Sequence, residues 1–146
     1  MTRNEIMSEL GLLLTDVNAG ILATTDKAGN PHMRWMTPAI LKDRAGVIFA
    51  VTSPKFNKSI QLQNNRHVEW MFQTPLLDKI ILIKGRVNLL DNSSIKAEVL
   101  EAIGPRLTVF WKLNEDERNL IVLETVIEEA TYFLPMKSRK IRVSFT

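Results

Sequence analysis

The chain has 146 residues, of which 45% are hydrophobic and 24% are charged, a balance typical of one folded globular domain. This composition argues against a disordered chain, and no apolar run reaches membrane-spanning length, so we expect no membrane partner. The absence of cysteine removes disulfides, thiol nucleophiles and zinc–thiolate sites, and with two histidines we expect no metal site. The net charge of +3 suits an anionic ligand without identifying one.

An amphipathic helix is predicted at the start of the chain. Thr2 and Glu5 have the spacing of a capping box, and apolar residues then recur at helical intervals as far as Val17. Glu5 and Glu9 interrupt the apolar stretch that a secretory signal requires, so we expect a cytoplasmic protein.

Strands in hairpin order are predicted next. Residues 20–25 and 31–41 flank a turn rich in Asp, Gly and Asn, and Pro38 indicates an edge, a bend or a bulge in the second strand. Residues 47–52 form a buried strand that ends at Ser53 and Pro54. A short helix over residues 55–65 leads to a strand over residues 67–73.

The second half of the chain continues this pattern. A long strand is predicted over residues 79–90, where Gly85 indicates a bulge or a sharp bend. Asn92 or Ser93 caps a helix that stops at Gly104, and residues 119–133 and 140–145 are further strands. The predicted fold is mainly β (α+β): a six-stranded antiparallel split β-barrel with short flanking helices, in one domain over residues 1–146.

Arg34 is the first candidate site residue. It lies among Met33, Trp35 and Met36, where burying a guanidinium would be costly without an anionic partner. An outward orientation on the polar face of the strand is equally compatible with the pattern.

The segment from Thr52 to Ser59 combines a strand end, a helix start, hydroxyl groups and two lysines. Free backbone N–H groups at a helix start attract phosphate. Three or four charge-assisted hydrogen bonds, each worth about 1.5–3 kcal/mol, would hold a phosphomonoester firmly. The alternative is a solvated basic helix face.

In their order and spacing these residues resemble the FMN-binding split-barrel family, the pyridoxamine 5'-phosphate oxidase-like proteins, and especially their short general-stress-protein type. The resemblance covers most of the chain. It rests on the strand over residues 20–25, the turn Gly29-Asn30-Pro31-His32, Arg34-Trp35-Met36, Phe49-Ala50-Val51-Thr52, Lys58, and residues 68–72.

The resemblance implies that Arg34 and Lys58 grip the phosphate of FMN. It further implies hydrogen bonds from Thr52 and Ser53, beside Val51, and a flavin ring that lies along Trp35, Met36 and Thr37. It also implies a homodimer in which Trp111 reaches the flavin from the second subunit. Trp111 as a core or interface anchor is the simpler alternative.

The chain departs from the family pattern at two points. Phe56 stands where the family commonly has a serine, two residues before the phosphate-binding lysine. The segment that binds the phosphorylated substrate in true oxidases is not recognisable near residues 137–142. Authentic pyridoxamine 5'-phosphate oxidase activity is therefore disfavoured.

The hypothesis from the sequence is an FMN-binding homodimer and flavin-dependent oxidoreductase that exchanges electrons with a small molecule. No side chain is identified as a catalytic acid or base. One alternative is a deazaflavin-using reductase of the same fold. Another is a non-catalytic nucleic-acid-binding barrel that uses basic residues 55–66 and 137–142, although the composition is not basic enough to favour it.

Overall fold

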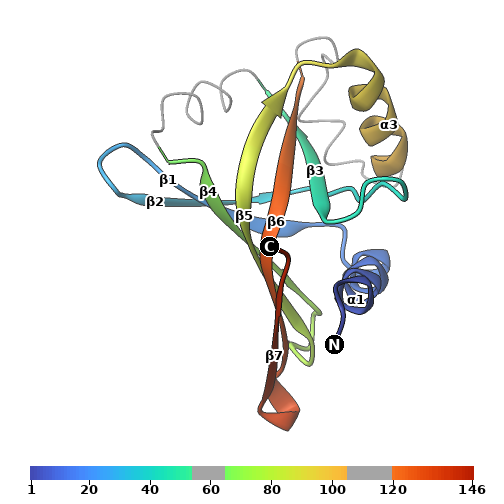
Figure 1. The fold of residues 1–146 in the computed structure, drawn as a ribbon, viewed down its shortest axis with the longest axis vertical. Coiled ribbons are helices and arrows are strands. Elements are labelled where there is room, and N and C mark those ends of the chain that lie inside the picture. The colour runs from blue at the N-terminus through green and yellow to red at the C-terminus, as the bar shows by residue number, and fades with distance from the viewer. Residues whose placement is uncertain (54–64, 105–119) are drawn as a thin grey trace.

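The computed structural model describes residues 1–53, 65–104 and 120–146. In these ranges, seven strands form one antiparallel sheet, and two α-helices pack against it (Figure 1). The elements are α1 (Arg3–Asp16), β1 (Gly20–Thr25), β2 (Pro31–Met36), β3 (Val47–Thr52), β4 (His67–Gln73), β5 (Ile80–Leu90), α3 (Ser93–Ile103), β6 (Ile121–Leu134), the 3-10 helix η2 (Pro135–Lys137) and β7 (Arg139–Ser144). The predicted mainly β, α+β class is confirmed. The sheet has seven strands, one more than the predicted six-stranded barrel, and one of them is β7, which matches the strand predicted over residues 140–145. After the turn at η2, β7 pairs along β6.

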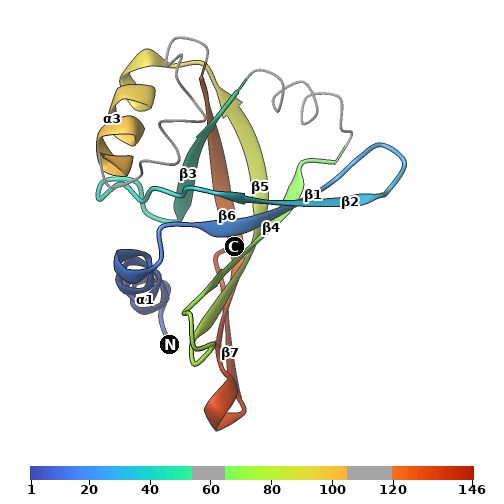
Figure 2. The ribbon, with the colours of Figure 1, turned by 180° about the vertical axis from the view of Figure 1, so that it is seen from behind.

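The sheet has the strand order β2-β1-β4-β5-β6-β3, with β7 paired to β6. One isolated bridge between Ala39 and Phe49 joins the chain after β2 to β3, so the two ends of the strand order meet. Both views show β2 crossing β3 instead of running alongside it (Figures 1 and 2). The result is an open sheet curled in the manner of a split barrel.

A bulge where β5 meets β6, with Glu128 of β6 as the extra residue, contributes to this curvature. The β5–β6 register shifts between Lys84 and Gly85, which confirms the predicted irregularity. A Cβ atom at Gly85 would collide with the backbone carbonyl oxygen of Val126. Only glycine therefore lets the two strands approach closely here.

Both helices begin at the predicted caps. Thr2 Oγ1 accepts a hydrogen bond from the Glu5 backbone N–H at 3.1 Å. Asn92 Oδ1, and not the Ser93 hydroxyl, accepts from the Ile95 backbone N–H at 3.1 Å. Strand β2 ends at Met36, two residues before Pro38, so the predicted strand over residues 31–41 is shorter than expected.

The strands separate two hydrophobic clusters. The first fills the inside of the curled sheet, and Ile6, Leu10 and Leu13 of α1 pack into it. The second lies between the other face of β3 and α3. Side chains of a strand alternate between its faces, so Ile48 and Ala50 belong to the first cluster while Phe49 and Val51 belong to the second.

Trp70 is one of the fully buried residues of the first cluster. Its ring stacks on Phe72 with the centroids 5.3 Å apart. Its indole Nε1 donates to Thr125 Oγ1 at 3.1 Å, so its polar atom is satisfied although the side chain is buried.

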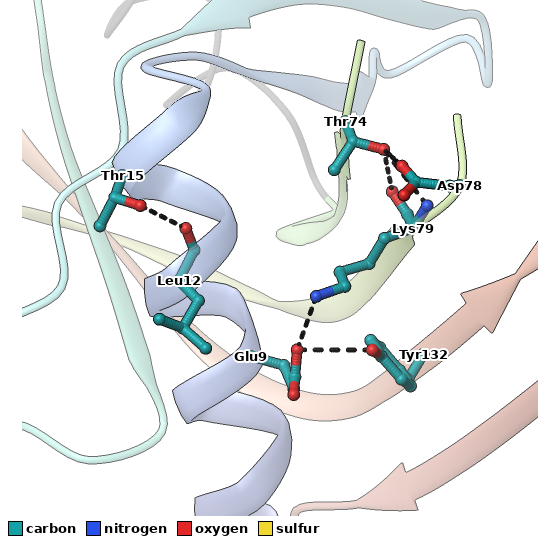
Figure 3. Close-up of polar contacts among 7 residues, drawn as sticks. All are labelled: Glu9, Leu12, Thr15, Thr74, Asp78, Lys79 and Tyr132. Atoms are coloured by element: carbon teal, nitrogen blue, oxygen red, sulfur yellow. Dashed lines mark hydrogen bonds and ion pairs between the residues drawn. The ribbon is translucent and has the colours of Figure 1, made fainter. Parts of the chain in front are cut away.

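A polar cluster ties α1 to the sheet (Figure 3). Lys79 Nζ donates to Glu9 Oε2 at 2.9 Å, and the Tyr132 hydroxyl donates to the same oxygen at 3.4 Å. The hydrogen bond that Lys79 donates to Glu9 raises the pKa of Lys79, and burial raises the pKa of Tyr132. The side chains of Glu9 and Lys79 are 29% and 28% exposed, so this is a half-buried ion pair on a helix-to-sheet contact.

Candidate functional site

The turn between β1 and β2 sets the register of this hairpin. Asp26 Oδ1 accepts hydrogen bonds from the backbone N–H groups of Ala28 and Asn30, at 3.0 and 2.9 Å. Asp26 Oδ2 lies 2.8 Å from Nε2 of His32. The hydrogen bond with His32 is the largest cause that lowers the pKa of Asp26. The His32 side chain is exposed, and its contact with Asp26 holds the turn.

This register brings Arg34 opposite Leu22 on β1. Arg34 Nη1 donates to Thr24 Oγ1 at 2.8 Å and to the Leu22 carbonyl oxygen at 3.3 Å. The side chain is half-buried, and burial lowers its pKa, although a guanidinium keeps its charge at any physiological pH. Of the two orientations compatible with the sequence, the structure has the inward one.

The two faces of β2 differ in a way that divides the predicted site. Met36, two residues after Arg34, is buried in the first cluster. Trp35 and Met33 point to the opposite face, where they are 52% and 74% exposed. Within one chain, the Trp35 side chain therefore does not lie beside the guanidinium of Arg34.

The end of β3 carries three further predicted residues. Thr52 is buried and continues the row of Ile48 and Ala50, whose side chains fill the first cluster. Val51 is buried on the other face, towards α3, and Ser53 is half-buried just after the strand. Thr52 and Val51 thus present their side chains to opposite sides of β3.

Arg34 and Thr52 are related through the bridge between Ala39 and Phe49. Arg34 lies five residues before Ala39, and Thr52 lies three residues after Phe49. Arg34 belongs to β2 and Thr52 ends β3, and these two strands are at opposite ends of the strand order and run at a steep angle to each other (Figure 2). Both nevertheless extend the rows of side chains, Met36 on β2 and Ala50 on β3, that fill the same interior cluster. Thr37, between β2 and the bridge, is buried.

Two predicted residues, Lys58 and Trp111, lie outside the described residues. Within the described ranges, no group of three or more His, Asp and Glu side chains could hold a metal ion. In the same part of the chain, neither α-helix has both the length and the hydropathy needed to cross a membrane.

Thr24 is a site residue that the sequence analysis missed. Its hydroxyl accepts from Arg34, and its side chain is buried. The position of Thr24 could have been derived from the sequence, because counting outward from the turn at Asp26 pairs Thr24 with His32. In that register Thr24 lies on the same face of the hairpin as Arg34.

A cleft of about 580 Å³ opens beside Thr24. Its charged lining includes Lys84, whose Nζ lies 3.9 Å from a carboxylate oxygen of Glu69 and 3.9 Å from one of Glu129. The lining also includes Glu128. Among the described residues of the lining, three carboxylates therefore face one lysine.

Comparison with known proteins agrees with this architecture. Residues 5–145 match the family model described as pyridoxamine 5'-phosphate oxidase like, and the chain belongs to that family. No curated protein matches the chain.

Solved structures show the same fold at low sequence identity. A Clostridium acetobutylicum protein related to general stress protein 26 is 13% identical, with a TM-score of 0.74 over 99% of this chain and 97% of its own. General stress protein 26 of Bacillus anthracis is 16% identical, with a TM-score of 0.68 over 94% of this chain and 98% of its own. A haem-binding protein of Mycobacterium smegmatis is 15% identical, with a TM-score of 0.66 over 90% of this chain and 55% of its own.

Proposed function

We propose that the protein binds FMN as a homodimer in the cytoplasm and uses it to exchange electrons with a small molecule. The observation that carries this proposal is the inward orientation of Arg34, a cation half-buried on the interior face of a strand. An ordinary surface strand would turn such a residue to water. A phosphate suits a guanidinium because the planar fork can donate two charge-assisted hydrogen bonds to it.

The residues of the site have distinct proposed roles. Arg34 binds the phosphate of FMN, and its hydrogen bond to Thr24 holds the guanidinium in place. Ser53 and the backbone after Thr52 add neutral donors, and Lys58 adds a second charge. When bound, the flavin supplies hydride and electron transfer, while this chain orients it and excludes water.

The dimer is proposed from the outer face of the hairpin. Ile21 pairs with Trp35 on one side and with Met71 on the other, so three apolar side chains form a row across β2, β1 and β4. With Met33 they make up what we call the outer stripe, and their exposed fractions run from 37% to 74%. An exposed apolar patch that includes a tryptophan is typical of a subunit interface. Partner contacts there would bring Trp35 and Trp111 towards the flavin ring that Met36 and Thr37 flank.

The alternatives are less well supported. Arg142 Nε lies 3.3 Å from Glu129, and Arg86 Nε lies 3.8 Å from Glu128, so carboxylates offset part of the basic surface that a nucleic acid would need. A deazaflavin is compatible with the same Arg34 geometry. The absorption spectrum of the purified protein, which differs for flavin, deazaflavin and haem, separates these cofactors.

The test compares FMN with riboflavin, which lacks the phosphate. Arg34→Ala should weaken FMN binding by about 10- to 100-fold, the loss of one charge-assisted hydrogen bond, and leave riboflavin binding unchanged. Arg86→Ala, an exposed arginine paired with Glu128, is the matched control and should bind FMN like the wild type. Equal affinity of the wild type for FMN and riboflavin would refute a phosphate site at Arg34.

A further inference from the structure

A second cleft lies between the first turn of α1 and the segment that leads into β3. Its volume is about 650 Å³, within the range of about 300–1,000 Å³ typical of small-molecule sites. Val47 and Val126, which pair across β3 and β6, lie in its wall. Val47 begins β3 and Thr52 ends it, so this α1–β3 cleft is at the opposite end of the strand from the proposed phosphate site.

The wall of the α1–β3 cleft is largely apolar. Met7 of α1, Ile40 and Phe145 line it, and each packs against the first cluster on its other side. Val126 is 41% exposed, although its neighbours Thr125 and Ile127 in β6 are buried. An apolar ligand body placed here would remove this surface from water.

The charged residues that line the cleft are all cationic: Arg3, Lys42 and Arg44. Asp43 lies between two of them in the sequence but does not line the cleft. Arg3 is already engaged, because its Nε donates to the Ser144 carbonyl oxygen at 2.9 Å.

Lys42 and Arg44 are the groups that remain available to a ligand. Within residues 1–53, 65–104 and 120–146, neither side chain forms an ion pair. Arg44 is half-buried and Lys42 is exposed. A half-buried guanidinium at the rim of an apolar wall attracts an anion more strongly than a fully solvated one.

From this combination we infer that the α1–β3 cleft binds an amphipathic anion, a small molecule with an apolar acyl body and one carboxylate head. The acyl body lies against Met7, Val126 and Phe145. The carboxylate is held by Arg44, whose planar fork suits two carboxylate oxygens, and by Lys42. The site needs no flavin, so it stands or falls independently of the proposed function.

The test measures binding of decanoate to the whole protein by titration calorimetry. Decyltrimethylammonium, with the same chain and the opposite charge, is the matched probe and should bind at least about tenfold more weakly. The double variant Lys42→Glu with Arg44→Glu should also weaken decanoate binding by about tenfold or more. The control is Lys137→Glu with Arg139→Glu, an equal change in net charge at the exposed η2–β7 turn, which should leave the affinity within about twofold.

Amide NMR shifts locate the site independently of the charge variants. Decanoate should shift the Gly46 and Phe145 backbone amides, and Val126→Asp should reduce its affinity by inserting a carboxylate into the wall. The proposal is overturned if decanoate does not bind or if the ammonium probe binds equally well. It is also overturned if the control variant weakens binding as much as the cleft variant does, or if excess FMN displaces decanoate.

Discussion

The two faces of β2 carry side chains in the reverse of the usual order. The inner face has a charged residue, Arg34, beside the buried Met36, whereas the outer face exposes Met33 and Trp35. Sorting by residue type alone would bury the tryptophan and solvate the arginine. The proposed phosphate site on the inner face and the proposed subunit interface on the outer face both rest on this inverted pattern.

The largest expected effect is a loss of stability, and it tests whether the inner face of the sheet forms the core. Trp70→Ala removes a fully buried ring that stacks on Phe72 and leaves Thr125 without its donor, so it should lower the free energy of unfolding by about 3–5 kcal/mol. Trp35→Ala, the same substitution on the exposed face, should change the unfolding free energy of the monomer by no more than about 0.5 kcal/mol. Urea unfolding at low protein concentration measures both, and similar losses would contradict the assignment of faces.

The proposed role of the outer stripe as a dimer interface is tested by measuring the monomer–dimer equilibrium. Trp35→Glu places a charge at the centre of the outer stripe, so it should weaken dimerisation by at least about 2 kcal/mol, the scale of an interface hot spot. Sedimentation equilibrium measures the monomer–dimer constant. Lys27→Glu, on the exposed hairpin turn, is the control for added negative charge. A wild-type chain that is monomeric at every concentration would remove the outer stripe as an interface.

The role of Arg34 is tested by measuring both stability and FMN binding in one variant. Arg34→Met keeps the length of the side chain and removes the charge, so stability should stay within about 1 kcal/mol of the wild type or rise. Phosphate-dependent FMN binding should be lost in the same variant. A large loss of stability with retained FMN selectivity would make Arg34 a structural residue that stabilises Thr24 and the hairpin.

Local features of this fold could be predicted from the sequence, because each depends on a few neighbouring residues. The caps at Thr2 and Asn92 and the irregularity at Gly85 are of this kind. Thr24 could have been found by counting outward from the turn at Asp26.

Features that depend on distant parts of the chain could not be predicted. The orientation of Arg34 follows from the pairing of Leu22 with Trp70 on β4, which directs that face of β1 and β2 towards the interior. The sequence predicts a strand over residues 140–145, but it does not predict the pairing of that strand, β7, with residues 129–134 of β6. The roles of Lys58 and Trp111 stay predictions.

Lys79, just before β5, is a half-buried cation whose Nζ pairs with the carboxylate of Glu9. The pKa values of Lys79 and Tyr132 are both raised, so the folded protein holds more protons than the unfolded chain above about pH 10. This contribution to stability is complete below the unfolded pKa values and is lost as the pH rises through the folded ones.

Lys79→Met should therefore lower stability by up to about 1 kcal/mol at neutral pH. It should also flatten the decline of stability between about pH 9.5 and 11, as followed by urea unfolding. Arg34→Met should leave that alkaline decline unchanged, since Arg34 does not titrate there. An unchanged slope in Lys79→Met would show that the contact between Glu9 and Lys79 contributes nothing to holding α1 on the sheet.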